Sequence, residues 1–556
     1  MKFSLLLALP MCFLSSFSYA QMTDDDLCIR NADGKCIDEE SEIREPQKEI
    51  YPYKPFSTEL IRQRMERLME GHEYISNIHH MDEKNLTRAN TKVQPWGGSF
   101  WPVYQGGIAN RYQRKDNVFY IFTPLKNTMY QANVKEYKNK SQKDHLKIYD
   151  LDEKALAKLS PAEKYDLLLG DATFSLTNRV WDFVEKRGEN RDYEYLTYLE
   201  LPDGYKRLEP KNFLAFWEGI CHGWALGSGF TPRPEKTVNF TLPNGKVLPF
   251  FPNDIKALAS QMWANSDVQN YSINEGGRCN VRNPHKDKYG RYIDTEIDPQ
   301  DHGVLKPNCG DVHPAIFHTF IVNYVGVEGR SFVYDHNPKA PIANQPVSGY
   351  EFTYFNAMTG KEGNLKASMV SRESFKDDPF AISRNPETTH IVGIQMNAKY
   401  VNWEKAIKKV VNSASDDKII DNEFKYDLEL NAQGEIIGGQ WRVSQKSKKP
   451  GVFAKSPNQP DYFWIVPRNW KSYFEEDKTV PAWEGNGLPP VEYKTAALAG
   501  HYFLQNSDSK LGGVNKCLVV AIDGEGPAKR VDCAFNVSRP RPLINVVNKL
   551  IELSRK

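Results

Sequence analysis

The sequence predicts an α+β protein, because segments with helical spacing are followed by segments typical of strands. Residues 57–80 place apolar side chains on one helical face, among them Leu60, Met65 and Leu68. From His313 onward, runs of aromatic and β-branched residues alternate with turns. Helices followed by strands within one region are typical of the α+β class.

Two further helices have clear start signals. In Ser160-Pro161-Ala162-Glu163, serine can cap the helix, proline suits the first helical position and Glu163 completes a capping box. Asn253-Asp254 begins a second helix, which we expect to run from Ile255 to about Asn265. A last helix is predicted over 542–553.

The strands are predicted in the second half of the chain. Residues 317–325 form one aromatic and β-branched strand, 326–329 turn the chain, and 331–335 form a second strand. Residues 424–443 predict a hairpin that turns at Asn431-Ala432-Gln433-Gly434.

Residues 1–20 are typical of a secretory signal peptide that is cut after Ala20. A lysine precedes a short apolar run, and small residues follow it. The alternative is an uncleaved membrane anchor, but the run is shorter than a membrane span usually needs. We therefore expect a secreted protein, periplasmic or extracellular, with no membrane span in the mature chain.

Length and charge limit the classes of partner. The chain has 556 residues, enough for about two to four domains. Its 72 basic and 71 acidic residues balance, and no long basic run occurs. We therefore expect neither nucleic acid nor an anionic membrane as a partner.

The cysteine count leaves one thiol over. Of eight cysteines, Cys12 leaves with the signal peptide. In an oxidising compartment we expect the remaining cysteines to pair. Pairing neighbours along the chain gives Cys28–Cys36, Cys279–Cys309 and Cys517–Cys533, although sequence alone does not prove the connectivity. The unpaired residue is Cys221, either a buried inert cysteine or a nucleophile.

The residues around Cys221 favour a nucleophile. Gly219 and Ile220 form a turn, and the following residues suit a helix that begins at the cysteine. A helix N-terminus lowers a thiol pKa, and backbone amides of the turn can hold the oxyanion of acyl transfer. Trp217 and Trp224 flank the thiol; such residues are usually core, but one could line a substrate tunnel.

A thiol nucleophile needs a base and an acid that orients the base. His318 is the predicted base, at the start of a strand, and Asp335 ends the next strand. Two adjacent antiparallel strands would bring these side chains together. His313 is the rival base, and either histidine could instead be structural. His222 and His336 adjoin Cys221 and Asp335 and are expected to point elsewhere.

An acidic loop is the one candidate metal site. It contains Asp294, Glu296, Asp298 and Asp301, whose oxygens could hold calcium. The glycine of an EF-hand loop is absent, so the alternative is a solvated acidic loop. No other cofactor is expected.

Two motifs then resemble known families. Gly219–Ala225 resembles the Gly-x-Cys-Trp theme of transglutaminases and papain-like proteases, with two residues inserted. Asn344–Tyr350 resembles the immune-eliciting epitope of the oomycete transglutaminase elicitor family. Other segments are similar to that family in the same order: 96–102, 253–258, 311–315 and 434–441. The resemblance covers roughly residues 90–470.

The resemblance implies a calcium-responsive transglutaminase with a papain-like catalytic core. Such an enzyme joins glutamine side chains to lysine amines of protein substrates through a cysteine thioester. The thiol carries over to Cys221, and the base and acid to His318 and Asp335. At Ser348 the family's basic residue is missing, which affects recognition by plants and not catalysis. The style of the signal peptide suggests a bacterial relative.

This interpretation divides the chain into four parts. After the signal peptide, 21–90 form an N-terminal extension, hypothesised to be an inhibitory pro-segment. Residues 91–475 form the catalytic domain and 476–556 a C-terminal accessory region. Two alternatives stay open: a papain-like cysteine protease with the same catalytic residues, and a non-catalytic surface or adhesion protein.

Overall fold

The computed structural model describes a large part of the chain after residue 55. The described residues are 56–111, 138–139, 142–189, 218–266, 268, 271–277, 285–286, 292–293, 312–336, 343–442, 459–498 and 542–556. Several sequence predictions lie outside them: the signal peptide, the three disulfides, Trp217 and the acidic loop with Asp294, Glu296, Asp298 and Asp301.

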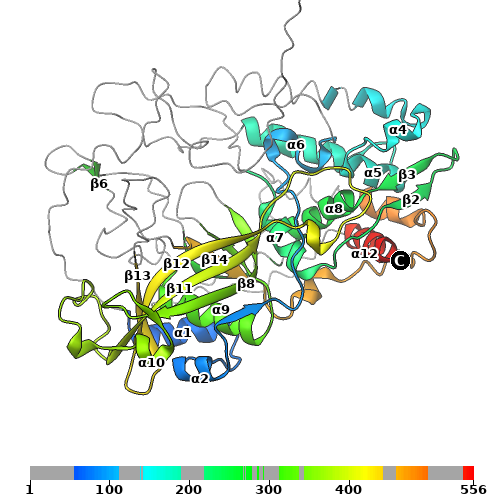
Figure 1. Cartoon of the computed structure of the whole chain (residues 1–556). Coiled ribbons are helices and arrows are strands. Elements are labelled where there is room, and N and C mark those ends of the chain that lie inside the picture. The colour runs from blue at the N-terminus through cyan, green and yellow to red at the C-terminus, as the bar shows by residue number, and fades with distance from the viewer. Residues whose placement is uncertain are drawn as a thin grey trace, which may run out of the picture. The chain divides into compact units, whose positions relative to one another are not determined.

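Helices and strands occur in both halves of the described chain (Figure 1). The α-helices are α1 (Thr58–Leu68), α2 (Ile78–Glu83), α4 (Glu153–Leu156), α5 (Pro161–Leu168), α6 (Ser175–Glu189), α7 (Cys221–Phe230), α8 (Pro252–Ala264), α9 (Pro314–Ile321), α10 (Leu365–Ser368) and α12 (Leu543–Arg555). A π-helix, η6 (Val322–Val327), continues α9.

The strands are β1 (Arg88–Asn90), β2 (Val238–Thr241), β3 (Val247–Phe250), β4 (Ile273–Gly276), β5 (His285–Lys286), β6 (Tyr292–Ile293), β7 (Val333–Asp335), β8 (Asn344–Phe355), β9 (Glu362–Gly363), β10 (Val370–Ser371), β11 (His390–Val401), β12 (Ile419–Leu430), β13 (Ile436–Trp441) and β14 (Tyr462–Ile465).

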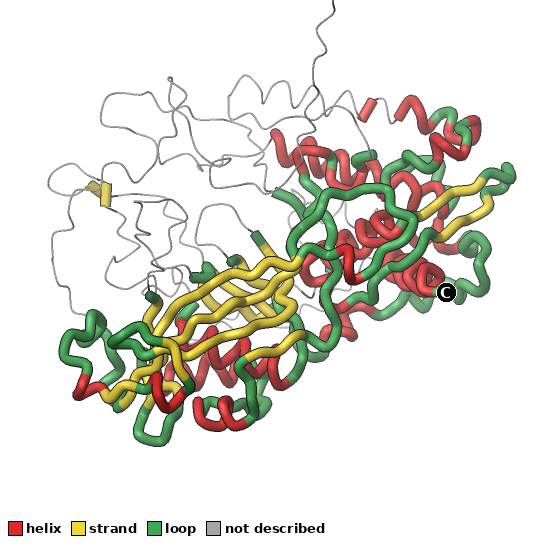
Figure 2. The backbone as a smooth tube through the Cα atoms, in the orientation of Figure 1, coloured by secondary structure: helices red, strands yellow, loops and turns green. Residues whose placement is uncertain are grey.

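One antiparallel sheet organises the described chain (Figure 2). Its strands follow the order β13-β12-β11-β8-β7-β14-β4. In addition, β1 and β9 pair with β8, and β10 pairs with β11. Segregated helices and an antiparallel sheet define the α+β class, so the predicted fold class is confirmed.

The sheet separates two hydrophobic cores. The first core gathers around Trp96, Trp181, Trp224 and Trp263, and the second around Phe317, Phe320, Phe352, Tyr426 and Trp441. Neighbouring residues of one strand divide between the cores: Val333 and Trp464 belong to the first, whereas Tyr334 and Phe463 belong to the second. Successive side chains of a strand point to opposite faces, so the two cores lie on opposite faces of these strands.

Strand β8 changes its facing at a bulge. Gly349 pairs with Lys399 and Val347 pairs with Tyr400, so Ser348 is the extra residue. After the bulge, Tyr350 points into the second core, as Val347 does before it. Asn344 therefore points to the first core's face, although its number has the same parity as Tyr350.

Glycines let α7 lie very close to α8. A Cβ on Gly223 would stand 2.2 Å from the carbonyl oxygen of Ser260 and 2.7 Å from the Cβ of Ala264. Glycine within a helix costs roughly 1 kcal/mol relative to alanine. Close packing of the two helix backbones offsets that cost and fixes the position of α7.

Several predicted elements are confirmed with shifted bounds. Ser160 and Glu163 form the predicted capping box at the start of α5. The hairpin of β12 and β13 turns where predicted, with Gly434 at φ 83°. The predicted helix over 57–80 is two helices, α1 and α2, because the chain turns at Gly71 with φ 76°.

The predicted strand over 317–325 is wrong. These residues lie in α9 and η6. His313 caps α9 by accepting from the Ala315 amide, and Pro314 occupies the first turn. Every residue of α9 is buried, so it lacks the polar face that identifies a surface helix.

Parts of the predicted extensions belong to the cores. Ile61, Met65 and Leu68 of α1 are buried in the second core, and Leu543 and Leu550 of α12 in the first. Removing α1 would therefore uncover the second core. The boundaries at 90 and 475 stay predictions.

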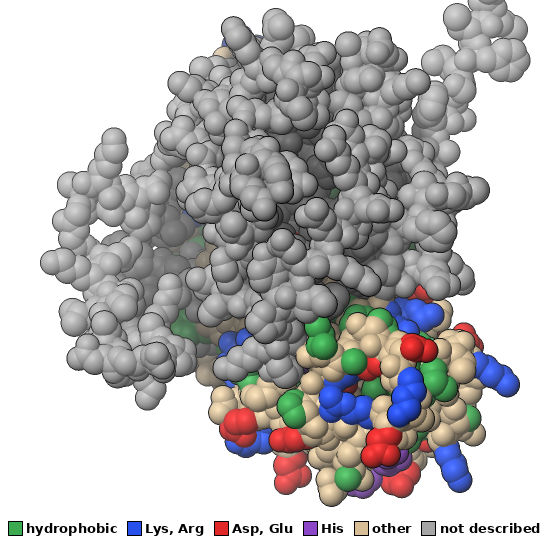
Figure 3. Space-filling model, turned by 90° about the vertical axis from the view of Figure 1, so that its left-hand side faces the viewer, with side chains coloured by type: hydrophobic (Ala, Val, Ile, Leu, Met, Phe, Trp, Pro, Cys, Tyr) green, Lys and Arg blue, Asp and Glu red, His purple; other side chains and the backbone are tan. Residues whose placement is uncertain are grey.

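The described surface is charged with both signs. Figure 3 shows one face of the molecule, and acidic and basic side chains are interspersed on the part of it that is not grey. Among the described helices, none is long and apolar enough to cross a membrane.

Candidate active site

Cys221 is the first residue of α7, as the sequence predicted. It is a partly buried free thiol and packs at the margin of the first core. The first amides of a helix have no partner within the helix, so this end carries partial positive charge. The His222 amide donates to the Cys221 sulfur.

A side chain from the sheet also contacts the thiol. Asn344, the first residue of β8, donates from Nδ2 to Cys221 Sγ at 3.4 Å. Asn344 pairs with Asp335 on β7, and Asp335 pairs with Tyr462 on β14. A row across three adjacent strands therefore faces the start of α7.

Asp335 is fully buried in this row. Its Oδ2 accepts from the Ala343 amide at 3.3 Å, and its charge acts on the thiol. Asp335 therefore lies close enough to Cys221 for its charge to act on the thiol, whereas the catalytic role of Asp335 stays a prediction.

The net effect on the thiol differs from the sequence prediction. Burial raises the pKa of the Cys221 thiol, and the negative charge of Asp335 raises it further. Hydrogen bonds from Asn344 and from the His222 amide act in the opposite direction without outweighing burial. The prediction of a lowered pKa considered the helix end alone and is wrong.

The turn before Cys221 is held by a neighbouring loop. Ile220 N donates to the carbonyl oxygen of Phe100 at 2.8 Å. Gly219 permits this approach, since a Cβ there would stand 2.2 Å from the same oxygen. The Ile220 amide is thus already bonded, and its predicted role as an oxyanion donor is wrong.

His318 is not beside Asp335. It lies in the middle of α9, fully buried, and its Nδ1 hydrogen-bonds to the hydroxyl of Tyr426 at 2.8 Å. Its ring also contacts Phe352, a residue of the second core. Asp335 points to the other face of the sheet, so the predicted His318–Asp335 pair is wrong.

The rival His313 is also on the second core's side. It caps α9 through Nδ1 and stacks on Phe56 with ring centroids 4.5 Å apart. Burial lowers the pKa of His313 and that of His318 to about 3, so both rings are neutral near pH 7. His313 is therefore a structural helix cap in this geometry.

His336 and Trp224 are the other described residues that the sequence placed next to Asp335 and near Cys221. His336 follows Asp335 and points to the opposite face, where its ring lies 5.0 Å from that of Tyr400. Trp224 is fully buried and belongs to the first core, and its indole N–H donates to the Trp96 carbonyl oxygen. It is a core residue and does not line a tunnel.

Sequence reasoning missed Asn344, Tyr462 and Trp464. The hydroxyl of Tyr462 and the indole nitrogen of Trp464 both donate to Asn344 Oδ1, at 3.1 Å and 3.2 Å. Asn344 begins the segment that resembles the elicitor epitope, but nothing in that motif indicates contact with a thiol. Its partners lie more than a hundred residues away in sequence.

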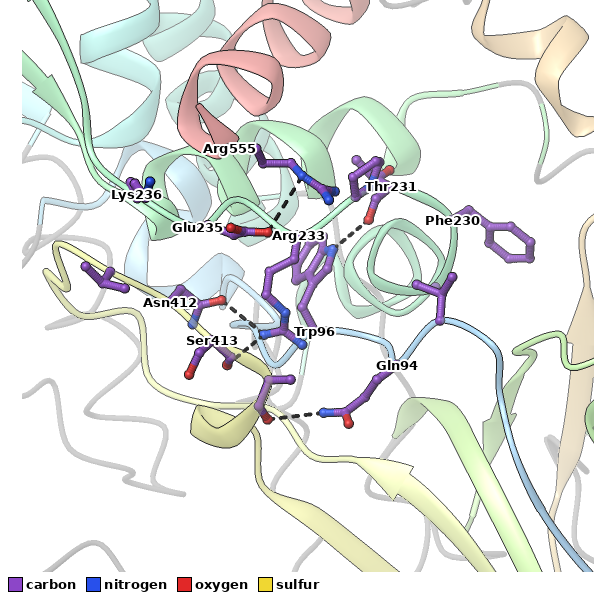
Figure 4. Close-up of a pocket in the computed structure, with 15 residues that line it drawn as sticks. Gln94, Trp96, Phe230, Thr231, Arg233, Glu235, Lys236, Asn412, Ser413 and Arg555 are labelled. Atoms are coloured by element: carbon purple, nitrogen blue, oxygen red, sulfur yellow. Dashed lines mark hydrogen bonds and ion pairs between the residues drawn. The ribbon is translucent and has the colours of Figure 1, made fainter.

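A cavity elsewhere does not include the thiol. It measures about 660 Å³ and is lined by residues that include Trp96, Arg233, Asn412 and Arg555 (Figure 4). Arg233 there is engaged by Asp417 at 3.0 Å and by Asn412 at 3.1 Å. The positive charge of Arg233 is thus paired with Asp417 within the protein. In the described part of the chain, no group of three or more His, Cys, Asp or Glu side chains could hold a metal ion.

A family model matches the part of the chain that contains the thiol. The sequence model of the transglutaminase elicitor family matches residues 210–469, which contain Cys221, Asp335 and Asn344. No curated protein matches. Among solved structures, the chain is similar to the crystal structure of the GP42 transglutaminase from Phytophthora sojae, with 19% identity, 78% of this chain and 96% of that chain covered, and a TM-score of 0.43. Over residues 210–469, the chain is similar to the transglutaminase elicitor family.

Proposed function

We propose that this protein is a secreted protein-glutamine γ-glutamyltransferase in which Cys221 is the nucleophile. The observation that supports this most is a free thiol at a helix N-terminus, contacted by Asn344, inside the segment matched by the family. A free thiol held between a helix end and a sheet is suited to form an acyl intermediate.

The proposed reaction has two halves. The Cys221 thiolate attacks the carboxamide carbon of a glutamine side chain, and ammonia leaves. A thioester remains on the sulfur. A lysine amine of a second protein then attacks the thioester carbon, which forms an isopeptide bond and frees the thiolate. The partly buried position of Cys221 limits the access of water, which would otherwise hydrolyse the thioester.

Asp335 is the acid whose charge acts on the thiol in this proposal. Asp335 raises the thiol pKa, which disfavours the thiolate at rest but stabilises a cation next to the sulfur. The attacking and departing nitrogen atoms pass through positively charged forms. A carboxylate facing that position is therefore suited to amine transfer.

The test is amine incorporation. The purified protein is incubated with a glutamine-containing peptide and a primary-amine probe, with and without calcium, and the products are weighed by mass spectrometry. We expect probe attached to glutamine with loss of ammonia, and none with Cys221→Ala. Backbone fragments would identify a cysteine protease instead. An unchanged peptide, with a thiol that also resists iodoacetamide, would favour a non-catalytic surface protein.

The same experiment tests for calcium dependence, and export needs a second experiment. The acidic loop with Asp294 and Asp301 is the proposed calcium site. If calcium bound there supports the activity, added calcium will raise the rate of amine incorporation and a chelator will lower it. Export is tested separately by cell fractionation, with the N-terminus of the exported protein expected at Gln21.

A further inference from the structure

The amide of Asn344 has a single possible orientation. An indole nitrogen can only donate, so the atom that Trp464 contacts must be the amide oxygen. Tyr462 donates to the same oxygen. The other end of the amide, Nδ2, is therefore the end that faces Cys221, and a flipped amide would place two nitrogen donors against each other.

This amide is held on a rigid element. Asn344, Tyr462 and Trp464 come from β8 and β14, which are both hydrogen-bonded to β7. The side chain of Trp464 lies in the first core, and Asn344 itself is 7% exposed. The side chains of Tyr462 and Trp464 thus fix the N–H donor of Asn344 before any substrate arrives, which is the property that makes electrostatic stabilisation of a transition state effective.

The position of this donor suits an oxygen bound to the carbon that the thiol attacks. Nδ2 lies 3.4 Å from Cys221 Sγ. In a tetrahedral intermediate the oxyanion is two bonds from sulfur, so a donor at this distance can approach it to roughly 2.7–3.1 Å, the range of effective oxyanion donors. The Ile220 amide is committed to Phe100 and does not compete for this place.

We propose that Asn344 is a catalytic residue whose Nδ2 moves its hydrogen bond from the thiolate to the oxyanion during acylation of Cys221, with Tyr462 and Trp464 as its positioning residues. This proposal deepens the proposed acyl-transfer function and rests on it only in assuming a carbonyl substrate.

The step balances with water as the sole proton carrier. The thiol first loses its proton to water. The sulfur lone pair then forms a bond to the carbonyl carbon, and the π electrons of C=O move to the oxygen that Asn344 contacts. When the carbonyl re-forms, the bond from carbon to the leaving group breaks, and that group takes its proton from water.

The test compares acylation with alkylation of the same sulfur. Acylation by p-nitrophenyl acetate passes through an oxyanion, whereas alkylation by iodoacetamide does not. Both rates are measured at a pH where the thiol is ionised, and mass spectrometry confirms modification at Cys221. For Asn344→Ala we expect acylation to slow by about 10²-fold while alkylation changes by less than about 3-fold.

Two further variants test the positioning and the specificity of the effect. Trp464→Phe removes one donor to Oδ1, and we expect the ratio of acylation to alkylation to fall by about 5-fold. Asn422→Ala is the matched control, because its amide donates to the His336 carbonyl and not to the thiol. We expect its ratio to equal that of the wild type. If Asn344→Ala does not fold, Trp464→Phe carries the test.

Each outcome separates this proposal from the proposed function. An unchanged ratio of acylation to alkylation in Asn344→Ala would overturn the oxyanion role, whether both rates slow equally or neither slows. Wild-type protein that is alkylated but never acylated at Cys221 would overturn it too. If the ester acylates Cys221 and the ratio falls as expected, but no amine is joined to glutamine peptides, the transglutaminase proposal fails and the role of Asn344 stands.

Discussion

The contact between α7 and α8 leads to the sharpest prediction, Gly223→Ala. The added Cβ would lie 2.2 Å from the Ser260 carbonyl oxygen and 2.8 Å from the Ala264 nitrogen. Both are backbone atoms of α8, so no flexible side chain can move aside. To reach ordinary van der Waals separation, α7 has to move by roughly 1 Å.

Two free-energy terms oppose each other in this variant. Overpacking a core contact costs about 1–3 kcal/mol, and the alanine returns about 1 kcal/mol of helix propensity. We therefore expect a loss of about 0–2 kcal/mol in the free energy of unfolding. Because Cys221 is two residues away on the displaced helix, its acylation should fall by about 10²-fold.

The assay measures the melting temperature and the rate of Cys221 acylation side by side. Gly229→Ala is the matched control on the same helix, because its Cβ would meet only the Ser331 side chain, at 3.1 Å. We expect the control to keep both properties. Gly223→Ala with wild-type stability and wild-type acylation would refute the claim that this contact positions the thiol.

Three other predictions concern charge. Asp335→Asn removes the carboxylate that raises the pKa of Cys221, so the pH midpoint of iodoacetamide alkylation should fall; an unchanged or higher midpoint would contradict the stated electrostatics. Burial lowers the pKa of His318 from 6.5 to about 3, so the unfolded chain binds a proton that the folded one does not, and stability falls as pH drops from about 6.5 toward 3. His318→Leu should make melting temperature less dependent on pH over that interval and leave the rate of iodoacetamide alkylation near pH 7 unchanged, whereas loss of a base that deprotonates the thiol would lower that rate. Lys164 bonds Asp254 at 2.6 Å with both side chains fully buried, so Lys164→Met should cost about 3–5 kcal/mol of stability, and a second change, Asp254→Asn, should recover part of it in thermal melts.

Local signals in the sequence located the thiol and several elements. The odd cysteine count singled out Cys221, and the glycine turn before it indicated a helix start. The capping box at Ser160 and the hairpin at Gly434 were equally local, since each depends on residues within one turn. Such features can be found without knowing which segments pack together.

The partners of the thiol could not be found in this way. His318 was assigned as a base because residues 317–325 resemble a strand, and an apolar run of that length is ambiguous between strand and buried helix. Pro314 at the first helical turn was the signal that could have decided it. Asn344 faces the thiol only because β8, β7 and β14 align and because the bulge in β8 sets which face each β8 side chain reaches. Both are properties of strand register and not of any motif.

The bulge at Ser348 has a consequence for how this chain can vary in length. Asn344 before the bulge faces the first core and Tyr350 after it points into the second, so the number of residues between them decides which face each one reaches. Deleting one residue would straighten the strand and turn either the amide away from the thiol or three tyrosine and phenylalanine rings away from the second core. A substitution in this stretch changes one side chain, whereas a single insertion or deletion would change the facing of every residue on one side of the bulge.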